Sequence, residues 1–305
     1  MSDMKNIETI KIDFADLYNE FQPFKDCKYF KLLQTCVFRG ESSLKYKLLP
    51  SILRETERSK WLNCSFIAPH YDKNLLSTQI FLELVILKKF YDFSNKQGLS
   101  LPKIPLIHHD EVMLMLFANF SKWLPEEWGE LAALAQHYGT PTRLLDWSFN
   151  FKTALYFMAH GACKKMENGS TQSDDKMVLW ALNKRHIDIL NYTKDHKTDL
   201  CFTIPAYAKN PNIQAQQGVL TFWKSNFCKF GSSVSLSIKP LDELISTIEG
   251  ASEPLLYKFE IPISDCFDIL TLLSLEGINS STIFPGFTGV SKALYDDAFY
   301  IKYGR

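Results

Sequence analysis

The spacing of hydrophobic residues changes along this chain of 305 residues, and that change restricts the folds open to it. In the first half, apolar residues recur at helical spacing and predict helices over 72–98, 110–122 and 125–139. In the second half, the runs VLWAL, VLTFW, SVSLSI and LLYKFEIP are typical of strands. No internal repeat and no convincing linker divides the chain. The pattern therefore predicts a single α+β domain, with a helical N-terminal half packed on a sheet, rather than a regular βαβ series.

Composition excludes several classes of protein. Lys and Arg number 34 and Asp and Glu number 34, so the zero net charge excludes a polycation that binds nucleic acid over its whole surface. The 23 Phe, 13 Tyr and 6 Trp residues exclude extensive disorder. The 7 Cys residues form no CxxC pair, which favours reduced thiols over a disulfide framework. Without a signal-peptide pattern or a membrane-length apolar run, the expected location is cytoplasmic.

The common motifs of nucleotide and metal enzymes do not occur in the sequence. There is no GxxxxGK[ST], no GxGxxG after a strand, no GxSxG and no HExxH. His108 and His109 lie next to a Pro-rich turn, and no second pair of ligands follows at metal-binding spacing. The sequence therefore favours a solvated histidine pair over a zinc site and predicts no metal.

Three clusters of polar residues remain, and the first is Phe38-Arg39-Gly40. An apolar run ends here in an arginine, followed by a glycine that permits a turn or the close approach of a ligand. Arg39 offers a planar, always-charged fork to a phosphate or carboxylate. The alternative is a salt bridge to a neighbouring acid at the edge of a strand.

The second cluster is the string QHYGTPTRLLDWS, at a predicted junction between a helix and a strand. A helix stopped at Gly139, with extended chain after Pro141, explains these two residues without a function. Arg143 and Asp146 either form a buried pair that holds the turn or belong to a site. His137 fits either a site or a satisfied position in the core.

The third cluster, QAQQG, precedes the strand-like run VLTFW. The carboxamides of Gln216 and Gln217 either cap backbone groups or read ribose hydroxyls and a base edge. The sequence leaves both readings open.

In this order the three clusters resemble the FRG-domain family, which is named after its Phe-Arg-Gly motif. The matching stretches are VFRGESSLKYKLLPSILRE, LAALAQHYGTPTRLLDWSFNFKTALYFMA, NIQAQQGVLTF, KFEIP and GINSSTIFPGFTGV. The resemblance implies an N-terminal strand and helix extension at 1–29, an FRG domain at 30–295 and a C-terminal tail at 296–305. The family occurs largely in bacteria and phages.

A more distant resemblance connects the clusters to ADP-ribosyltransferases. In that class an Arg-Gly pair ends the first core strand, a Ser-containing strand leads into an Ala-rich helix, and a later strand bears the catalytic Glu. Arg39-Gly40, DWS before FKTALYFMA, and QAQQGVL follow the same order here. The resemblance implies a mainly antiparallel, ADP-ribosyltransferase-like sheet, with NAD as co-substrate.

The same resemblance implies residue roles. Arg39 would hold the NAD pyrophosphate or the nicotinamide ribose, and Ser148 or Asp146 would buttress that subsite. A Gln in the position of the Glu supplies no negative charge to an oxocarbenium-like transition state, so Asp146 or Glu41 must substitute, or the domain binds without turnover. The candidate catalytic residues are Arg39, His137, Asp146 and Gln217, and the candidate NAD-binding residues are Arg39, Gly40, Tyr138, Arg143, Trp147, Ser148 and Gln216.

Two functions from different classes follow. The first is an ADP-ribosyltransferase-like enzyme that uses NAD to modify an unknown macromolecular acceptor, as a toxin or a phage-defence effector. The second is a non-catalytic module that recognises a nucleotide or a nucleic-acid end through rings and amides. A third reading assigns the clusters to the fold alone. Net charge does not indicate nucleic-acid binding, and no membrane partner is expected.

Overall fold

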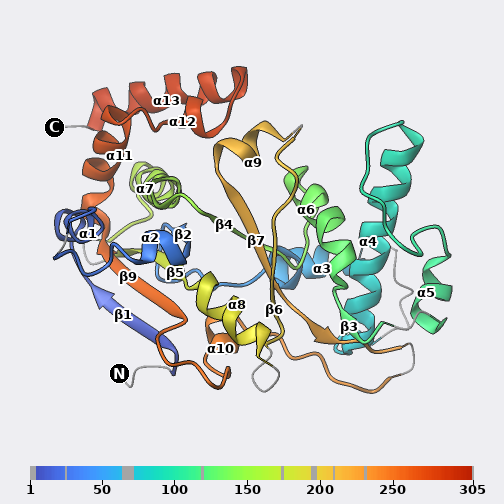
Figure 1. Cartoon of the computed structure of the whole chain (residues 1–305). Coiled ribbons are helices and arrows are strands. Elements are labelled where there is room, and N and C mark those ends of the chain that lie inside the picture. The colour runs from blue at the N-terminus through green and yellow to red at the C-terminus, as the bar shows by residue number, and fades with distance from the viewer. Residues whose placement is uncertain are drawn as a thin grey trace.

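The computed structural model describes residues 5–24, 26–63, 72–117, 120–172, 175–193, 198–208, 210–229 and 232–303. Its centre is a seven-stranded sheet in the order β1-β9-β5-β2-β4-β7-β6 (Figure 1). The strands of this sheet are β1 (Ile7–Lys11), β2 (Val37–Glu41), β4 (Leu145–Ser148), β5 (Lys176–Leu182), β6 (Leu200–Thr203), β7 (Gly218–Trp223) and β9 (Leu256–Pro262). A separate ribbon pairs β3 (Lys122–Trp123) with β8 (Ser225–Asn226).

The sheet is mixed but mainly antiparallel, as predicted. Among the residues that the structure describes, β1 and β9 are the only parallel neighbours in it. The pairs β9–β5, β5–β2, β2–β4, β4–β7 and β7–β6 are antiparallel. Antiparallel neighbours need no helical crossover, so the helices are free to gather in groups.

Helices surround the sheet along the whole described chain. They are α1 (Phe14–Glu20), α2 (Leu32–Thr35), α3 (Glu55–Asn63), α4 (Leu76–Lys96), α5 (Glu111–Phe117), α6 (Gly129–His137), α7 (Phe151–Glu167), α8 (Lys184–Tyr192), α9 (Pro211–Ala215), α10 (Leu241–Ile245), α11 (Cys266–Leu275), α12 (Ser280–Ile283) and α13 (Phe287–Tyr303). Helices thus continue well beyond the N-terminal half in which the sequence concentrates them. None of those that the structure describes is both long and apolar enough to cross a membrane.

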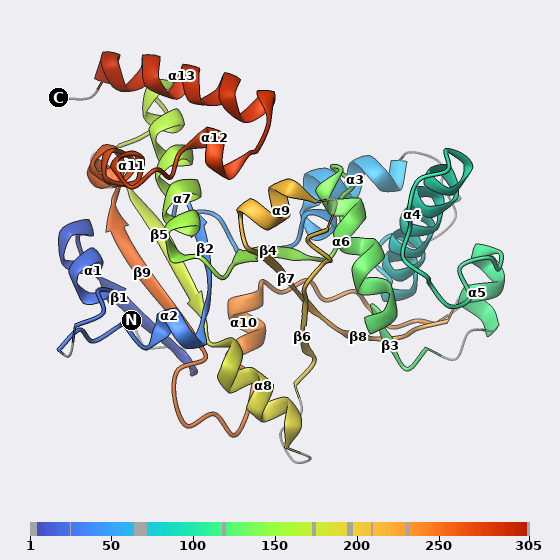
Figure 2. The ribbon, with the colours of Figure 1, turned by 45° about the horizontal axis from the view of Figure 1, so that its top comes forward.

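Three apolar cores hold these layers together. On one face of the sheet, α1, α7 and α11 pack on β2, β5 and β9. On the same face, α4 and α6 pack with β7 in a second core. The opposite face is covered by α8 and α10. Figure 2 shows β4 running between the α7 group and the α6 group, so residues on this strand lie where two cores meet.

Two predicted elements differ from the structure. The helix predicted over 110–122 is wrong at its end, because α5 stops at Phe117 and Lys122–Trp123 pairs with β8. The strand predicted for SVSLSI is also wrong, since Ser235 makes only an isolated bridge to Leu75. Val234 is half exposed, so the alternating apolar residues of this run do not form a buried face that would anchor it to a sheet.

Candidate functional site

Arg39 joins two strands that diverge. β2 pairs with β5 along its length but with β4 only where Phe38 faces Ser148. The guanidinium spans the divergence, since its Nη1 donates to the backbone oxygen of Asp146 at 2.7 Å. Its Nε and Nη2 lie 2.8 and 2.7 Å from Oε1 of Glu41. The salt bridge that the sequence left open is therefore present, and an anionic ligand at Arg39 would compete with Glu41.

Gly40 lets a helix pass close to β2. A Cβ at this position would lie 2.0 Å from the backbone oxygen of Ala154 and 2.7 Å from Cβ of Met158, both in α7. No side chain tolerates such contacts, so only glycine allows α7 to cross the strand here. The close approach at Gly40 is thus made by the protein itself.

Arg143 is buried and pairs with Glu83 of α4. Its Nε lies 2.6 Å from Oε2 and its Nη2 lies 2.9 Å from Oε1 of that carboxylate. Its Nη1 donates to Oγ of Ser225 at 3.0 Å and to the backbone oxygens of Trp123 and Trp223 at 3.2 and 3.3 Å. The Arg143–Asp146 pair considered from the sequence is wrong, because β4 begins only at Leu145 and the residues before it turn toward α4.

Asp146 is exposed at the end of the second cluster. Its Oδ1 accepts a hydrogen bond of 2.7 Å from Nε2 of Gln136, whose own oxygen accepts from Thr142. His137 is half-buried, with its ring 5.1 Å from that of Tyr138. The Tyr138 side chain is 67% exposed, so the C-terminal end of α6 presents an aromatic ring to solvent next to an acid-bearing strand.

The third cluster meets the second at the start of α7. Oγ of Ser148 donates to the backbone oxygen of Gln216 at 2.6 Å and accepts from the backbone N–H of Asn150 at 2.8 Å. Asn150 caps α7, since its side chain accepts from the N–H of Lys152. Nε2 of Gln216 donates to the backbone oxygen of Ile283 at 3.2 Å. Gln216 therefore caps backbone, while the side chain of Gln217 is exposed on a left-handed residue with φ 47°.

Side-chain alternation places the predicted residues on two faces of the sheet. Arg39 stands opposite Trp180, which belongs to the core under α8 and α10, and Glu41 follows on the same face. Trp147 is buried on that face, with its Nε1 donating to Oγ1 of Thr221 at 2.8 Å. The cross-strand partner of Ser148 is Phe38, which lies under α7.

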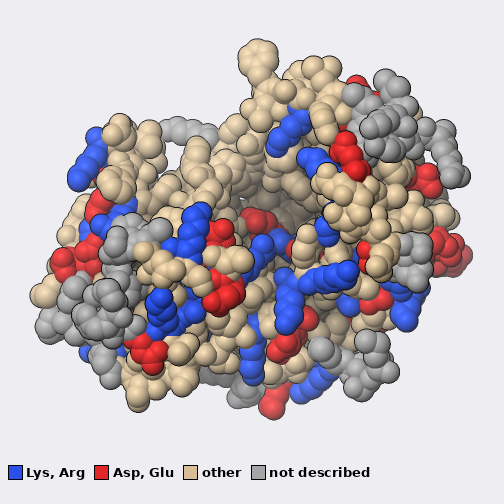
Figure 3. Space-filling view, turned by 180° about the vertical axis from the view of Figure 1, so that it is seen from behind, with Lys and Arg blue, Asp and Glu red and all other residues tan. Residues whose placement is uncertain are grey.

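Asp146 shares the α7 and α6 face with Ser148, because residues two apart on a strand point the same way. The structure therefore brings Arg39 and Glu41 into contact but leaves the carboxylate of Asp146 on the other side. Seen from behind, the molecule is hollowed near its centre, and both acidic and basic side chains lie around that hollow (Figure 3).

Glu83 is a residue that the sequence analysis missed. It lies inside the apolar stretch FLELVIL of α4 and is 4% exposed. A carboxylate in such a run signals a buried cationic partner, because an unpaired buried charge is too costly. The sequence therefore shows that Glu83 needs a cationic partner, but it does not show that this partner is Arg143. His108 and His109 are exposed, and within the described ranges no three metal-binding side chains gather.

Comparisons with known proteins bear on the first two clusters. The family model of the FRG domain matches residues 34–167, a range that contains Arg39, His137 and Asp146 and ends before Gln216. No curated protein and no solved structure matches the chain. The matched range includes both the Phe-Arg-Gly motif and the junction between α6 and β4. Residues 34–167 are therefore similar to FRG domains.

Proposed function

We propose that this protein is an ADP-ribosyltransferase-like enzyme that uses NAD to modify a macromolecule. The observation that carries the proposal is the order of the strands. The stretches that resemble the NAD site of that class lie on three neighbouring strands, β2, β4 and β7. Phe38, Ser148 and Gly218 form one row across these strands, beside Arg39 and Gln217. A single ligand can meet all three stretches only if their strands are neighbours.

Arg39 is the proposed binding group for a phosphate or ribose of NAD. Its side chain is 16% exposed, so part of the guanidinium is within reach of a ligand. A guanidinium binds phosphate best through two parallel donors, and Glu41 now takes up two of those of Arg39. NAD would bind by replacing Glu41 at one or more of the guanidinium donors that the carboxylate now occupies.

Glu41 is a better candidate than Asp146 for the missing acid. A carboxylate must lie beside the reacting ribose to stabilise an oxocarbenium-like transition state. Glu41 touches the guanidinium of Arg39, while the carboxylate of Asp146 binds Gln136 and only its backbone oxygen meets Arg39. We therefore assign the acid to Glu41 and a supporting role at the α6–β4 junction to Asp146.

The test is nicotinamide release from NAD by the purified full chain, with and without cell lysate. We expect the wild-type protein to release nicotinamide and Arg39→Ala to release none. In Glu41→Gln the rate should fall by about a hundredfold or more, because the loss of one group that stabilises developing charge typically has an effect of that size. Asp146→Asn should retain most of the rate. A dependence on lysate would indicate a macromolecular acceptor.

Folding is checked by circular dichroism and thermal melting of every variant, with the exposed Arg185→Ala as the matched arginine control. The proposal fails if folded wild-type protein releases no nicotinamide with NAD and lysate, or if Arg39→Ala releases it at the wild-type rate. Saturable NAD binding without release would instead support a recognition module. The exposed Tyr138 ring favours that second candidate, because a base can stack on it.

A further inference from the structure

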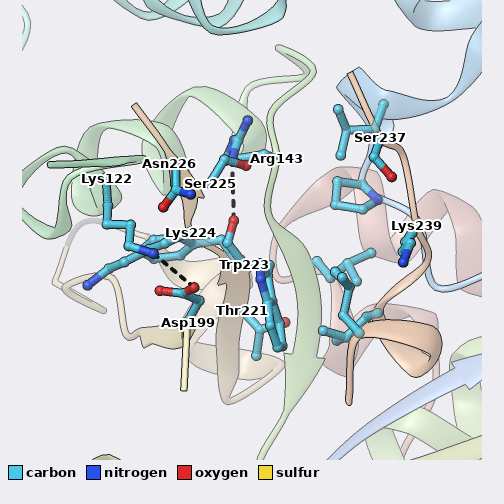
Figure 4. Close-up of a pocket in the computed structure, with 16 residues that line it drawn as sticks. Lys122, Arg143, Asp199, Thr221, Trp223, Lys224, Ser225, Asn226, Ser237 and Lys239 are labelled. Carbon is cyan, nitrogen blue, oxygen red and sulfur yellow. Dashed lines mark hydrogen bonds and ion pairs between the residues drawn. The ribbon is translucent and has the colours of Figure 1, made fainter. Parts of the chain in front are cut away.

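A cavity lies on the α10 side of β4 and β7 (Figure 4). Its volume is about 360 Å³, and its walls come from β4, β7, the β3–β8 ribbon and the chain that leads into α10. Ligand pockets usually measure about 300–1,000 Å³, so this one suits a ligand of mononucleotide size better than a dinucleotide. Neither Arg39 nor Glu41 lines it, so the cavity is distinct from the site proposed for NAD.

One part of the wall is apolar and contains a flat ring. Leu145 of β4 and Leu241 and Leu244 of α10 supply aliphatic surface. Trp223, at the end of β7, is only half-buried and adds an indole. A planar, weakly polar group such as a nucleobase fits such a wall, because every base has a face that stacks on an aromatic ring.

Basic side chains outnumber acidic ones in the wall, with Lys122, Arg143, Lys224 and Lys239 against Asp199. Nη1 of Arg143 is on the pocket side and meets Ser225, whereas its partner Glu83 does not line the cavity. The cavity therefore faces the positive end of that buried ion pair. Lys122 also lines it and is held by Asp199 at 3.0 Å.

Lys239 is the cation most available to a ligand. Its side chain is exposed and, within the described ranges, no acid lies within ion-pair distance of it. Figure 4 shows Lys239 across the cavity from Trp223 and Lys122. An anionic group that enters the cavity could therefore bind the ammonium of Lys239 without displacing a carboxylate.

We infer that this cavity binds a mononucleotide, with the base against Trp223 and the phosphate near Lys239. Ser225, Ser237 and Asn226 supply hydroxyl and amide groups for ribose or base atoms. The inference does not depend on the proposed transferase activity, because neither Arg39 nor Glu41, to which that activity is assigned, lines the cavity. A phosphate monoester is the required chemistry, either on a free nucleotide or at the end of a nucleic acid.

The test is calorimetric titration of the full chain with AMP, adenosine, inorganic phosphate and a short 5′-phosphorylated oligonucleotide. We expect saturable AMP binding, weaker adenosine binding, and competition by phosphate. Lys239→Glu should weaken AMP binding by about tenfold or more, the equivalent of one charge-assisted hydrogen bond. The matched control is Lys103→Glu, an exposed lysine that does not line the cavity.

Trp223→Leu should weaken AMP and adenosine equally, since it removes stacking and no charge. Arg39→Ala should leave AMP binding unchanged, which separates this site from the one proposed for NAD. AMP affinity that is equal in wild type and Lys239→Glu, or no AMP binding by folded protein, would overturn the inference. So would AMP binding that Arg39→Ala abolishes. Tighter binding of the oligonucleotide than of AMP would identify a nucleic-acid end as the source of the phosphate.

Discussion

At the scale of single residues, Arg143 shows how one charged side chain can serve the fold. Its guanidinium is 5% exposed and is bound by a carboxylate, a hydroxyl and two backbone oxygens that come from α4, β3, β7 and β8. A buried pair of this kind adds little net stability compared with apolar residues. Breaking it is costly, because the remaining charge is buried without a partner.

We therefore predict that Arg143→Met, which leaves Glu83 unpaired, lowers the free energy of unfolding by about 3–5 kcal/mol. Urea denaturation followed by circular dichroism measures the loss. Arg185→Met is the control, and its exposed side chain should cost no more than about 0.5 kcal/mol. Equal stability of Arg143→Met and the wild type would show that the pair with Glu83 does not hold the framework together.

At the scale of elements, the crossing of α7 over β2 depends on Gly40. The helix comes so close that an added Cβ would meet a backbone carbonyl, and neither element can move without disturbing the core under α7. The Phe-Arg-Gly motif thus combines a residue of the candidate site with a residue that positions the helix behind it.

We predict that Gly40→Ala destabilises the protein by about 3 kcal/mol or more, at or above the upper end of ordinary overpacking. Gly139→Ala is the comparison, because Gly139 has φ 86° with nothing near its missing Cβ. Gly139→Ala should lower the free energy of unfolding by only about 1–2 kcal/mol, the cost of placing a residue with a Cβ in a left-handed backbone conformation. Equal losses in the two variants, measured by urea denaturation, would show that the contact with α7 is not limiting.

At the scale of the whole molecule, the C-terminal helices are tied to the rest through a buried acid. Asp296 of α13 accepts from His160 of α7 at 3.0 Å and from Ser280 of α12. Tyr156 of α7 meets the same serine at 2.5 Å. Burial alone would raise the pKa of Asp296, but the hydrogen bonds from His160 and Ser280 outweigh it and hold the pKa below its ordinary value.

A depressed carboxyl pKa stabilises the fold above the unfolded value of about 3.9, and that stabilisation is lost as the pH falls through the folded value. We predict that Asp296→Asn lowers the free energy of unfolding by about 1–3 kcal/mol at pH 7. The difference from wild type should shrink as the pH falls below about 4. Urea denaturation between neutral and acid pH follows it, with the exposed Asp297→Asn as control. A difference that does not change with pH would mean that the charge of Asp296 is not involved.

Much of the architecture was open to prediction because it depends on local patterns. The periodicity of α4, the capped start of α7 and the strands β5, β7 and β9 follow from residue spacing that the sequence displays directly. The FRG motifs were likewise recognisable as strings. Periodicity failed at segments such as SVSLSI. Its pattern predicts a strand, but in the structure the segment has no neighbouring strand to pair with.

The sequence by itself determined the mixed class of the fold and the FRG motifs, because both depend on residues close together in the chain, whereas the mainly antiparallel sheet was expected only from a resemblance. Only the tertiary structure decided which polar groups meet. Arg143 pairs with Glu83, 60 positions away, and Arg39 with Glu41 and the backbone of Asp146. Strand pairing sets the face on which each side chain emerges, and the approach of distant elements selects its partner. The spacing of residues within one segment shows neither the face on which a side chain emerges nor the partner that it meets.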